Sequence, residues 1–174
     1  SGGVSDNFRN WFVIVSDTPF DYIRAVDDKE INETTEALSS HSGAIVGFRT
    51  GHRLEVGLKV ASSFISLDQA WRNLEEIGDR SFDEVRAEAK DKWNMVLSRI
   101  QVAGGSEDQY RTFYSCLYRS TLFPRKFYEM DAEGKPYHYS PYNGEVCDGY
   151  LYTDTGFWDT FRALFPLLNL VYPS

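Results

Sequence analysis

The first third of the chain carries short apolar runs with the composition of β-strands. Runs at residues 11–15, 20–26 and 43–49 are rich in branched and aromatic side chains and end at polar or turn-forming residues. The polar stretch 27–42 predicts a solvated loop with room for a short helix. This part of the chain is therefore predicted to be β-sheet.

The clearest strand pattern lies at residues 53–64. Apolar and polar residues alternate there, and those expected to share one face are Leu54, Val56, Leu58 and Val60. A period of two predicts one buried and one solvated face, as in an antiparallel sandwich. Because residues 50–52 form a turn signal, we expect a hairpin with the strand at 43–49.

From Ser66 onward the apolar spacing changes to three and four residues, which predicts helices. Three helices are each expected to begin at a capping box, in which a serine and a side chain three residues later bond each other's backbone amides. The pairs are Ser66 with Gln69, Ser81 with Glu84 and Ser106 with Gln109. The expected ends lie near Gly78, at Gly104-Gly105 and at Pro124.

The third helix carries an aromatic stripe of Tyr110, Tyr114 and Tyr118, which favours a core face over the lining of a groove. Residues 125–152 return to loops and short strands. A last helix is expected from 155 to about 170, with a kink because Pro166 lies inside it. Strands followed by helices in separate runs indicate a multi-domain α+β protein.

Composition narrows the function classes. The 174 residues are 16% aromatic, which is enough apolar mass for a core. The net charge of -8 makes nucleic acid and anionic lipid unexpected partners, and no apolar run is long enough to predict a membrane span. Since the chain starts without Met and stops directly after an apolar segment, we expect it to be a piece of a longer protein.

Several common chemistries have no motif here. A phosphate-binding glycine loop and a GxSxG elbow are both missing from the sequence. His41, His52 and His138 are scattered without metal-ligand spacing. Cys116 and Cys147 are predicted to be free thiols, although a disulfide between them stays open. We therefore assign no metal ligand.

The segment 150–162 is dense in aromatic residues and holds two acids. Trp158 next to Asp159 suits sugar recognition, because the ring can stack on a pyranose while the carboxylate accepts two hydroxyl hydrogens. The alternative places Trp158 in the core and leaves Asp159 as a carboxylate at a helix start. Asp154 is a further candidate, with helix capping as its alternative.

Other charged residues near this segment have weaker patterns. Arg125 follows a helix end and is expected to clamp a carboxylate from the 127–160 region or to offset the helix C-terminus. The loop acids are predicted to be solvated, because no spacing pairs them as acid and base; they are Glu129, Asp131, Glu133, Glu145 and Asp148.

Several motifs in order resemble glycoside hydrolase family 92 α-mannosidases, over about residues 54–174. They are the runs 67–74 and 82–86, Trp93, Phe113-Tyr114, 122–125, 152–154 and 158–164. The first fifty residues resemble the family's N-terminal sandwich only loosely. The resemblance implies part of a β-sandwich at 1–65, a helical linker at 66–105 and the start of an (α/α)6 barrel at 106–174.

The resemblance also implies a function. The parent protein would be an exo-acting, calcium-dependent, inverting α-mannosidase, of α-1,2 type, that acts on mannose-containing glycans in the periplasm or outside the cell. Trp158, Asp159 and Asp154 would then bind the terminal mannose at the barrel mouth. In the family the catalytic acid, the base and the calcium ligands come from later barrel segments, so we expect no catalytic residue in this chain and no activity from it alone.

Two further expectations follow. An incomplete barrel would expose two apolar faces, the stripe Tyr110, Phe113, Tyr114 and Leu117 and the run Phe161, Leu164, Phe165 and Leu168. We therefore expect self-association through these faces or pairing with the missing part of the barrel. The alternatives are another sandwich-plus-(α/α)6 glycosidase or phosphorylase, or a non-catalytic carbohydrate-binding module, which would bind glycan without calcium.

Overall fold

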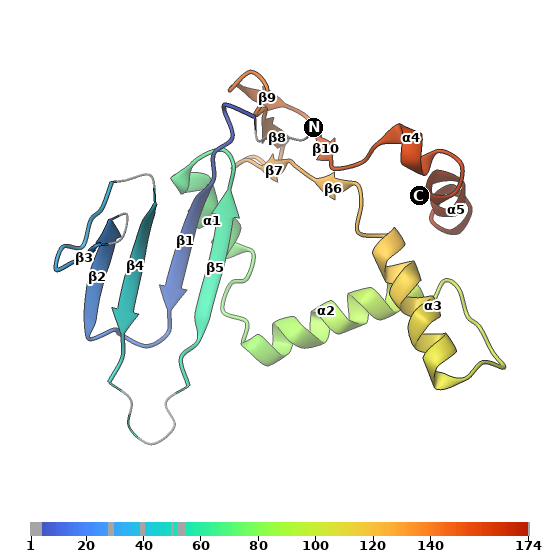
Figure 1. The fold of residues 1–174 in the computed structure, drawn as a ribbon, viewed down its shortest axis with the longest axis horizontal. Coiled ribbons are helices and arrows are strands. Elements are labelled where there is room, and N and C mark those ends of the chain that lie inside the picture. The colour runs from blue at the N-terminus through green and yellow to red at the C-terminus, as the bar shows by residue number, and fades with distance from the viewer. Residues whose placement is uncertain (1–4, 28–29, 39–40, 50, 52–54, 174) are drawn as a thin grey trace.

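The computed structural model describes residues 5–27, 30–38, 41–49, 51 and 55–173. Strands occupy the first third, helices follow, and a second group of short strands precedes the last two helices (Figure 1). The predicted α+β order is confirmed, while the domain boundaries remain predictions. Within these ranges, no helix combines the length and the apolar character that crossing a bilayer requires.

The first sheet joins residues far apart in the sequence. β1 (Trp11–Ser16) pairs antiparallel with β5 (Leu58–Ser63), and Ile14 lies opposite Val60. The predicted hairpin between β5 and the strand before it is therefore wrong. The long-range pairing brings Val13 and the end of β5 under the same helix, which a local hairpin would not do.

The second sheet has the order β3-β2-β4. Its strands are β2 (Tyr22–Asp27), β3 (Glu30–Asn32) and β4 (Ser42–Gly47). The strand β3 lies inside the stretch predicted as a loop or short helix, so that prediction is wrong there. Its three residues pair along the edge of β2, where a short strand needs little apolar surface.

The helix α1 (Leu67–Glu75) covers one face of the β1–β5 sheet, where Val13 and Ser63 are buried. The other face carries apolar side chains that are each more than half exposed: Phe12, Ile14, Leu58 and Val60. Burial of Leu58 and Val60 was predicted and is wrong in this structure. Leu54 lies outside the described residues. The alternation predicts two faces, but it does not say which face a helix covers.

The capping residues start the helices as predicted, with one difference. Ser81 and Ser106 form complete capping boxes at α2 (Phe82–Leu97) and α3 (Glu107–Ser120). At α1, Ser66 Oγ accepts from the Gln69 backbone N–H, but the Gln69 side chain bonds elsewhere, so the box is half formed. The helix α2 ends at Leu97, before the predicted end at Gly104-Gly105. The helix α3 ends at Ser120, before the predicted end at Pro124.

The aromatic stripe of α3 packs against α2 and the loop that follows it. The Tyr118 ring contacts Trp93 edge-on at 4.5 Å, and Tyr114 donates its hydroxyl hydrogen to the Ile100 carbonyl oxygen over 3.2 Å. Leu117 is buried. The core interpretation therefore holds for Tyr114, which is half-buried, whereas Tyr118 remains 39% exposed in spite of its contact with Trp93. The face that was expected to be exposed is half-buried or buried at all four positions: Tyr110, Phe113, Tyr114 and Leu117.

Residues 125–153 form short strands, as predicted. β7 (Glu129–Met130), β8 (Pro136–Tyr139) and β9 (Val146–Asp148) make one small sheet. β6 (Arg125–Lys126) pairs antiparallel with β10 (Tyr152–Thr153), which brings the two ends of the excursion together.

The last predicted helix is two helices, α4 (Phe157–Thr160) and α5 (Leu164–Val171). Pro166 is the third residue of α5, a position whose N–H would be unpaired in any helix, so no internal hydrogen bond is lost there. The proline ring would clash with the carbonyl of residue 162 in a continuous helix, and the chain breaks over 161–163 instead of kinking at the proline.

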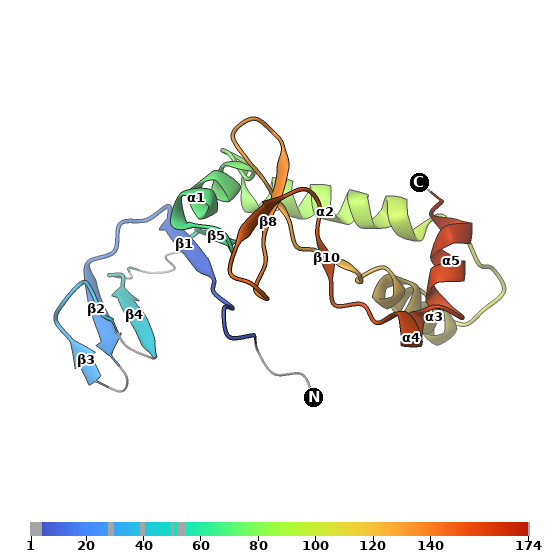
Figure 2. The same ribbon diagram turned by 90° about the horizontal axis from the view of Figure 1, so that it is seen from above.

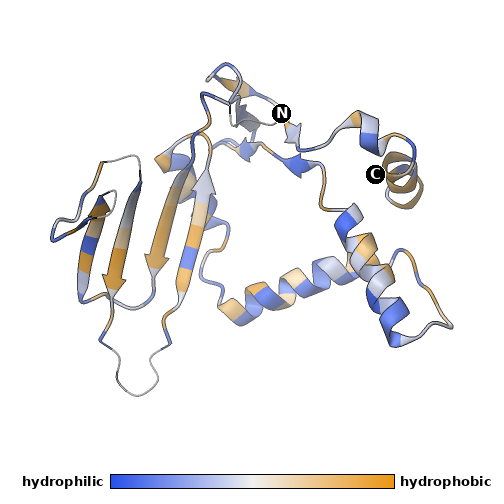
Figure 3. Cartoon of the chain, viewed as in Figure 1, coloured by the Kyte–Doolittle hydropathy of each residue, from blue (hydrophilic) through white to orange (hydrophobic). Residues whose placement is uncertain are grey.

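The elements form an elongated arrangement. The β1–β5 sheet and the β3-β2-β4 sheet lie at one end and α3, α4 and α5 at the other, with α2 and the segment through β6 and β10 as the two connections (Figures 1 and 2). Apolar residues dominate β1, β4 and α5, whereas α2 is mixed along its length (Figure 3). Tyr172 donates its hydroxyl hydrogen to the Val96 carbonyl oxygen over 3.0 Å, which ties the end of α5 to α2.

Candidate functional site

A groove of about 790 Å³ lies where the β6–β10 pair meets the end of the first sheet. Its aromatic lining comes from distant parts of the chain: Phe8, Phe64, Phe127, Tyr142 and Tyr152. Phe64 stacks on Phe127 with ring centroids 4.4 Å apart, and Phe8 contacts Phe64 at 5.6 Å. Arg125 and Asp154 add charged groups to this lining, and we call the cavity the Asp154 groove.

Arg125 clamps Asp154. Its Nε and Nη2 atoms both donate to Asp154 Oδ2, over 2.6 and 2.5 Å. Because β6 and β10 pair Arg125 directly with Thr153, the sheet register places the guanidinium beside the next residue. The predicted clamp on a carboxylate is therefore confirmed, and the alternative role of Arg125 at the helix end is not needed.

Asp154 has an unusual backbone conformation, with φ at 65°. Left-handed backbone costs a non-glycine residue about 1–2 kcal/mol, so a contact must hold it in place. Asp154 does not cap the following helix: the N-cap of α4 is Gly156, which makes no side-chain capping bond. The capping alternative is wrong, and the carboxylate belongs to the groove.

Two neighbours of Asp154 add hydrogen-bonding groups to the same wall. A side-chain hydrogen bond with Tyr128, and after it burial, raise the pKa of Tyr152, so this phenol keeps its proton well into alkaline solution. The Thr155 Oγ1 atom is buried without a hydrogen-bond partner among the described residues.

Trp158 and Asp159 lie on α4, outside the groove lining. Trp158 is 87% exposed, so the core interpretation of this ring is wrong. Asp159 occupies the first turn of α4, where its charge suits the helix dipole. The structure therefore leaves both side chains open to solvent but does not bring them together with Asp154 in one cavity.

Part of this site has no signal in the sequence. Phe8 and Phe64 gave no signal, because they reach the groove only through the pairing of β1 with β5. Glu129 was grouped with solvated loop acids, which is wrong: it is partly buried and accepts hydrogen bonds from three residues.

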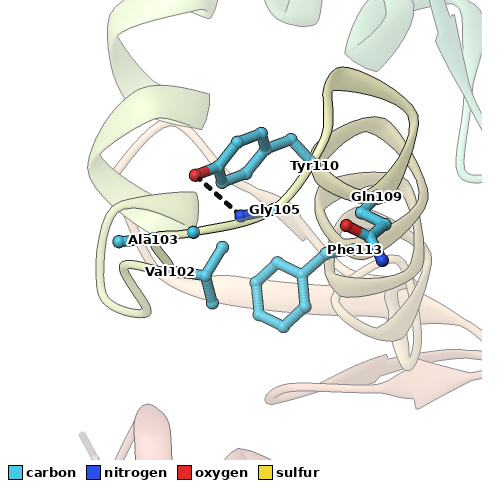
Figure 4. Close-up of a pocket in the computed structure, with 7 residues that line it drawn as sticks. Val102, Ala103, Gly105, Gln109, Tyr110 and Phe113 are labelled. Atoms are coloured by element: carbon cyan, nitrogen blue, oxygen red, sulfur yellow. Dashed lines mark hydrogen bonds between the residues drawn. The ribbon is translucent and has the colours of Figure 1, made fainter.

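A second, smaller pocket of about 310 Å³ lies in the loop between α2 and α3 (Figure 4). Tyr110, Gln109 and Phe113 line it from α3, opposite Val102, and Gly105 N–H donates to the Tyr110 hydroxyl over 3.4 Å. Tyr110 thus lines a hollow, unlike the other two tyrosines of the stripe. The pocket has no charged lining residue.

Metal and thiol chemistry find little support within the described ranges. No three His, Cys, Asp or Glu side chains gather there in a way that could hold a metal ion. These described residues therefore offer no ligand set for calcium. His138 Nδ1 lies 2.9 Å from the Gly149 carbonyl oxygen, and Cys116 and Cys147 are free thiols.

Comparisons with known proteins identify the family of this chain. The family model "Glycosyl hydrolase family 92 catalytic domain" matches residues 69–174. The match to a family GH92 inverting mannosidase from Bacteroides thetaiotaomicron has 42% identity and a TM-score of 0.90, over 97% of this chain and 23% of that one. A family GH92 α-mannosidase from the same organism, solved in complex with mannoimidazole, matches at 26% identity and TM-score 0.76, over 93% and 22%.

A curated protein of Arthroderma benhamiae, described as an uncharacterized secreted glycosidase, is 39% identical over 77 residues, 41% of this chain and 10% of that protein. The chain thus spans less than a quarter of the length of each relative. The structural match also supports the fold class of a β-sandwich followed by helices.

Proposed function

The chain belongs to glycosyl hydrolase family 92, and from this premise we propose that it is part of an α-mannosidase. The enzyme would remove terminal mannose from glycans, with inversion and with preference for α-1,2 linkages. The Asp154 groove is the observation that carries the proposal, because it combines aromatic faces with a fixed carboxylate.

The groove has the chemistry that a sugar requires. Both bonds from Arg125 end on Asp154 Oδ2, which leaves Oδ1 to accept hydroxyl hydrogens from a ligand. The exposed Arg125 guanidinium has further N–H groups that can donate to sugar oxygens. Phe64, Phe127 and Tyr152 offer apolar surface to the C–H face of a pyranose.

Trp158 and Asp159, which lie on α4 outside the groove lining, are proposed as a second contact surface for the sugar. A ring that is 87% exposed can stack on a sugar that enters from solvent. In this proposal the terminal mannose contacts Asp154 in the groove, and Trp158 and Asp159 contact it from the α4 side.

Hydrolysis with inversion requires an acid and a base about 6.5–9.5 Å apart, with water between the base and the sugar. Asp154 is paired with Arg125, and Asp159 is exposed in the first turn of a helix, so neither lies in the apolar surroundings in which a carboxylic acid serves as the proton donor. We therefore propose that the acid, the base and the calcium ligands lie outside this chain, and that the chain alone is inactive. Action outside the cytoplasm is proposed from the name of the curated relative.

Mannosidase activity of the complete polypeptide tests the proposal. On α-1,2-mannobiose, Asp154→Asn and Asp159→Asn should each lower kcat/KM about 10- to 100-fold, because each loses a charged acceptor worth about 1.5–3 kcal/mol. Trp158→Ala should cost about tenfold. Asp148→Asn, an exposed carboxylate on β9, is the matched control and should leave kcat/KM unchanged.

Three further measurements separate the parts of the proposal. The first sugar released should be β-mannose, a chelator should abolish turnover, and residues 1–174 alone should give none. Absence of α-mannoside hydrolysis by the complete polypeptide would contradict the proposed function. Glycan binding by the chain without calcium or turnover would favour a binding module instead.

A further inference from the structure

A polar cluster lies behind the Asp154 groove, where α1 meets β7 and β8. Its members come from four elements: Ser63, Gln69, Asn73, Glu129 and Tyr137. Ser63 is 1% exposed and Gln69 3%, and they are the buried polar residues of the described chain. Burying polar side chains this completely costs free energy of folding unless each of them forms hydrogen bonds.

Glu129 is the acceptor at the centre of this cluster. Its Oε1 accepts from Ser63 Oγ and from the Phe64 backbone N–H, both over 3.0 Å. Its Oε2 accepts from Asn73 Nδ2 over 2.6 Å. All three contacts are donors, so they fit an ionised carboxylate, which has acceptors only.

The remaining hydrogen bonds determine how the side-chain amides of Gln69 and Asn73 are oriented around the Glu129 carboxylate. Gln69 Nε2 donates to Asn73 Oδ1 over 2.8 Å and to the Met130 carbonyl oxygen over 2.9 Å. Tyr137 donates its hydroxyl hydrogen to Gln69 Oε1 over 2.7 Å. Burial, and after it the charge of Glu129, raises the pKa of Tyr137, so the phenol remains a donor.

The cluster touches the groove through two aromatic residues. Phe64, whose N–H bonds Glu129, stacks on Phe127, and both rings line the groove. Phe127 lies two residues before Glu129 on the same segment. The carboxylate therefore holds the first sheet and the 125–153 excursion together at the place where each supplies one ring.

We propose that Glu129 is a positioning residue of the sugar groove, which fixes the Phe64–Phe127 stack against which the sugar binds. The proposal rests on the proposed function. Glu129 itself touches no substrate, and it acts through the backbone of Phe64 and through Asn73.

Glutamine cannot replace Glu129 in this network. If the glutamine oxygen takes the place of Oε1, the glutamine NH2 group faces the NH2 group of Asn73. If the glutamine oxygen takes the place of Oε2, the glutamine NH2 group faces the Phe64 N–H. Turning Asn73 over would remove its bond of 2.8 Å to the Ser62 carbonyl oxygen and would set its NH2 group against that of Gln69. Each choice leaves a donor without an acceptor, which favours local opening.

The experiment compares Glu129→Gln with native protein in the complete polypeptide. Hydrogen exchange read by mass spectrometry should be at least tenfold faster in peptides that hold Phe64 and 127–130, and unchanged in α2. The dissociation constant of mannoimidazole, measured by calorimetry well below the unfolding temperature, should rise about tenfold or more. If Glu129→Gln does not fold, Asn73→Ala, which removes one donor to Oε2, is expected to act in the same direction.

Two control variants separate positioning from general stability. Glu133→Gln, an exposed side chain in the adjacent turn, should leave exchange and affinity native. Ser81→Ala should open the start of α2 and lower Tm without changing the affinity.

Native exchange at Phe64 in Glu129→Gln, or faster exchange with native affinity, would overturn the proposal. Failure of the native protein to bind mannoimidazole would refute the proposed function and the positioning role with it. The exchange measurement would still show whether Glu129 holds Phe64, so the two failures are distinguishable.

Discussion

At the scale of single residues, Arg125 and Asp154 determine what the groove presents to a ligand. The backbone of Asp154 is left-handed, and the forked guanidinium holds its carboxylate from one side. One oxygen is thereby fixed and the other left open. A ligand meets an acceptor that needs little reorganisation before it binds.

Arg125→Lys is predicted to raise KM for α-1,2-mannobiose about tenfold in the complete polypeptide. A lysine ammonium keeps the charge but cannot donate two bonds from a planar fork, so the Asp154 carboxylate gains freedom. Arg111→Lys, in an exposed pair with Asp108 on α3, is the matched control and should leave KM unchanged. A native KM in Arg125→Lys would contradict the positioning of Asp154 by the fork.

Asp154→Gly separates the backbone from the carboxylate. Glycine adopts positive φ without strain, so Tm should stay native or rise slightly, whereas sugar binding should be lost with the acceptor. A parallel loss of Tm and binding would instead mean that the clamp is needed for folding.

At the scale of helices and strands, cap chemistry sets where the helices start. Ser81 donates its backbone N–H to the Glu84 carboxylate, and its hydroxyl adds a second bond. These bonds, the backbone one first, lower the pKa of Glu84. A carboxyl with a lowered pKa stabilises the folded state above its unfolded pKa, and this contribution is lost as pH falls through the folded value.

The free energy of unfolding is therefore predicted to fall as the solution is acidified from pH 7 to below the ordinary carboxyl value of 4.5. In Glu84→Gln this part of the pH dependence should be missing, and the curves of the two proteins should converge at low pH. Urea unfolding followed by helical circular dichroism measures the difference. Glu75→Gln, exposed on α1, is the control, and parallel curves for native and Glu84→Gln would refute the cap's role.

Local signals predicted the elements well and their partners poorly. The serine caps located the starts of α1, α2 and α3, the branched and aromatic run at 11–15 located β1, and the period of two at 53–64 located β5, because these signals depend on residues a few positions apart. The pairing of β5 with β1 depends on contacts 42 or more residues apart, as does the half-formed box at Ser66, whose Gln69 bonds Met130 instead. Pro166 predicted a kink within one helix, but the chain instead forms two helices that are separated before the proline, over residues 161–163.

The same difference between local signals and long-range contacts applies to the candidate site. Arg125 was predicted to clamp a carboxylate, because a cation after a helix end and acids further along are visible in the sequence. Glu129 looked like any other loop acid, since its three donors come from the end of β5, from Phe64 directly after it and from α1, 56 to 66 residues earlier. The aromatic lining from Phe8 and Phe64 was invisible for the same reason.

At the scale of the whole molecule, the distribution of apolar surface differs from the expected one. The α3 stripe is mostly covered by α2 and the loop after it. The β1–β5 sheet instead presents Phe12, Ile14, Leu58 and Val60 to solvent on the face away from α1. A contiguous apolar face of this kind favours association.

Self-association of the 174-residue chain is therefore predicted to run through this sheet face. Ile14→Lys with Val60→Lys should shift the chain toward monomer in light scattering at equal concentration, because burying two lysine charges against a second apolar surface is costly. The two lysines lie directly opposite each other on paired strands, so a modest loss of Tm is expected as well. Phe82→Lys with Met95→Lys places the same charge at two exposed positions of α2 and should leave the association native. Equal association of both double variants, or a native chain that is already monomeric, would show that this face is not the one that associates.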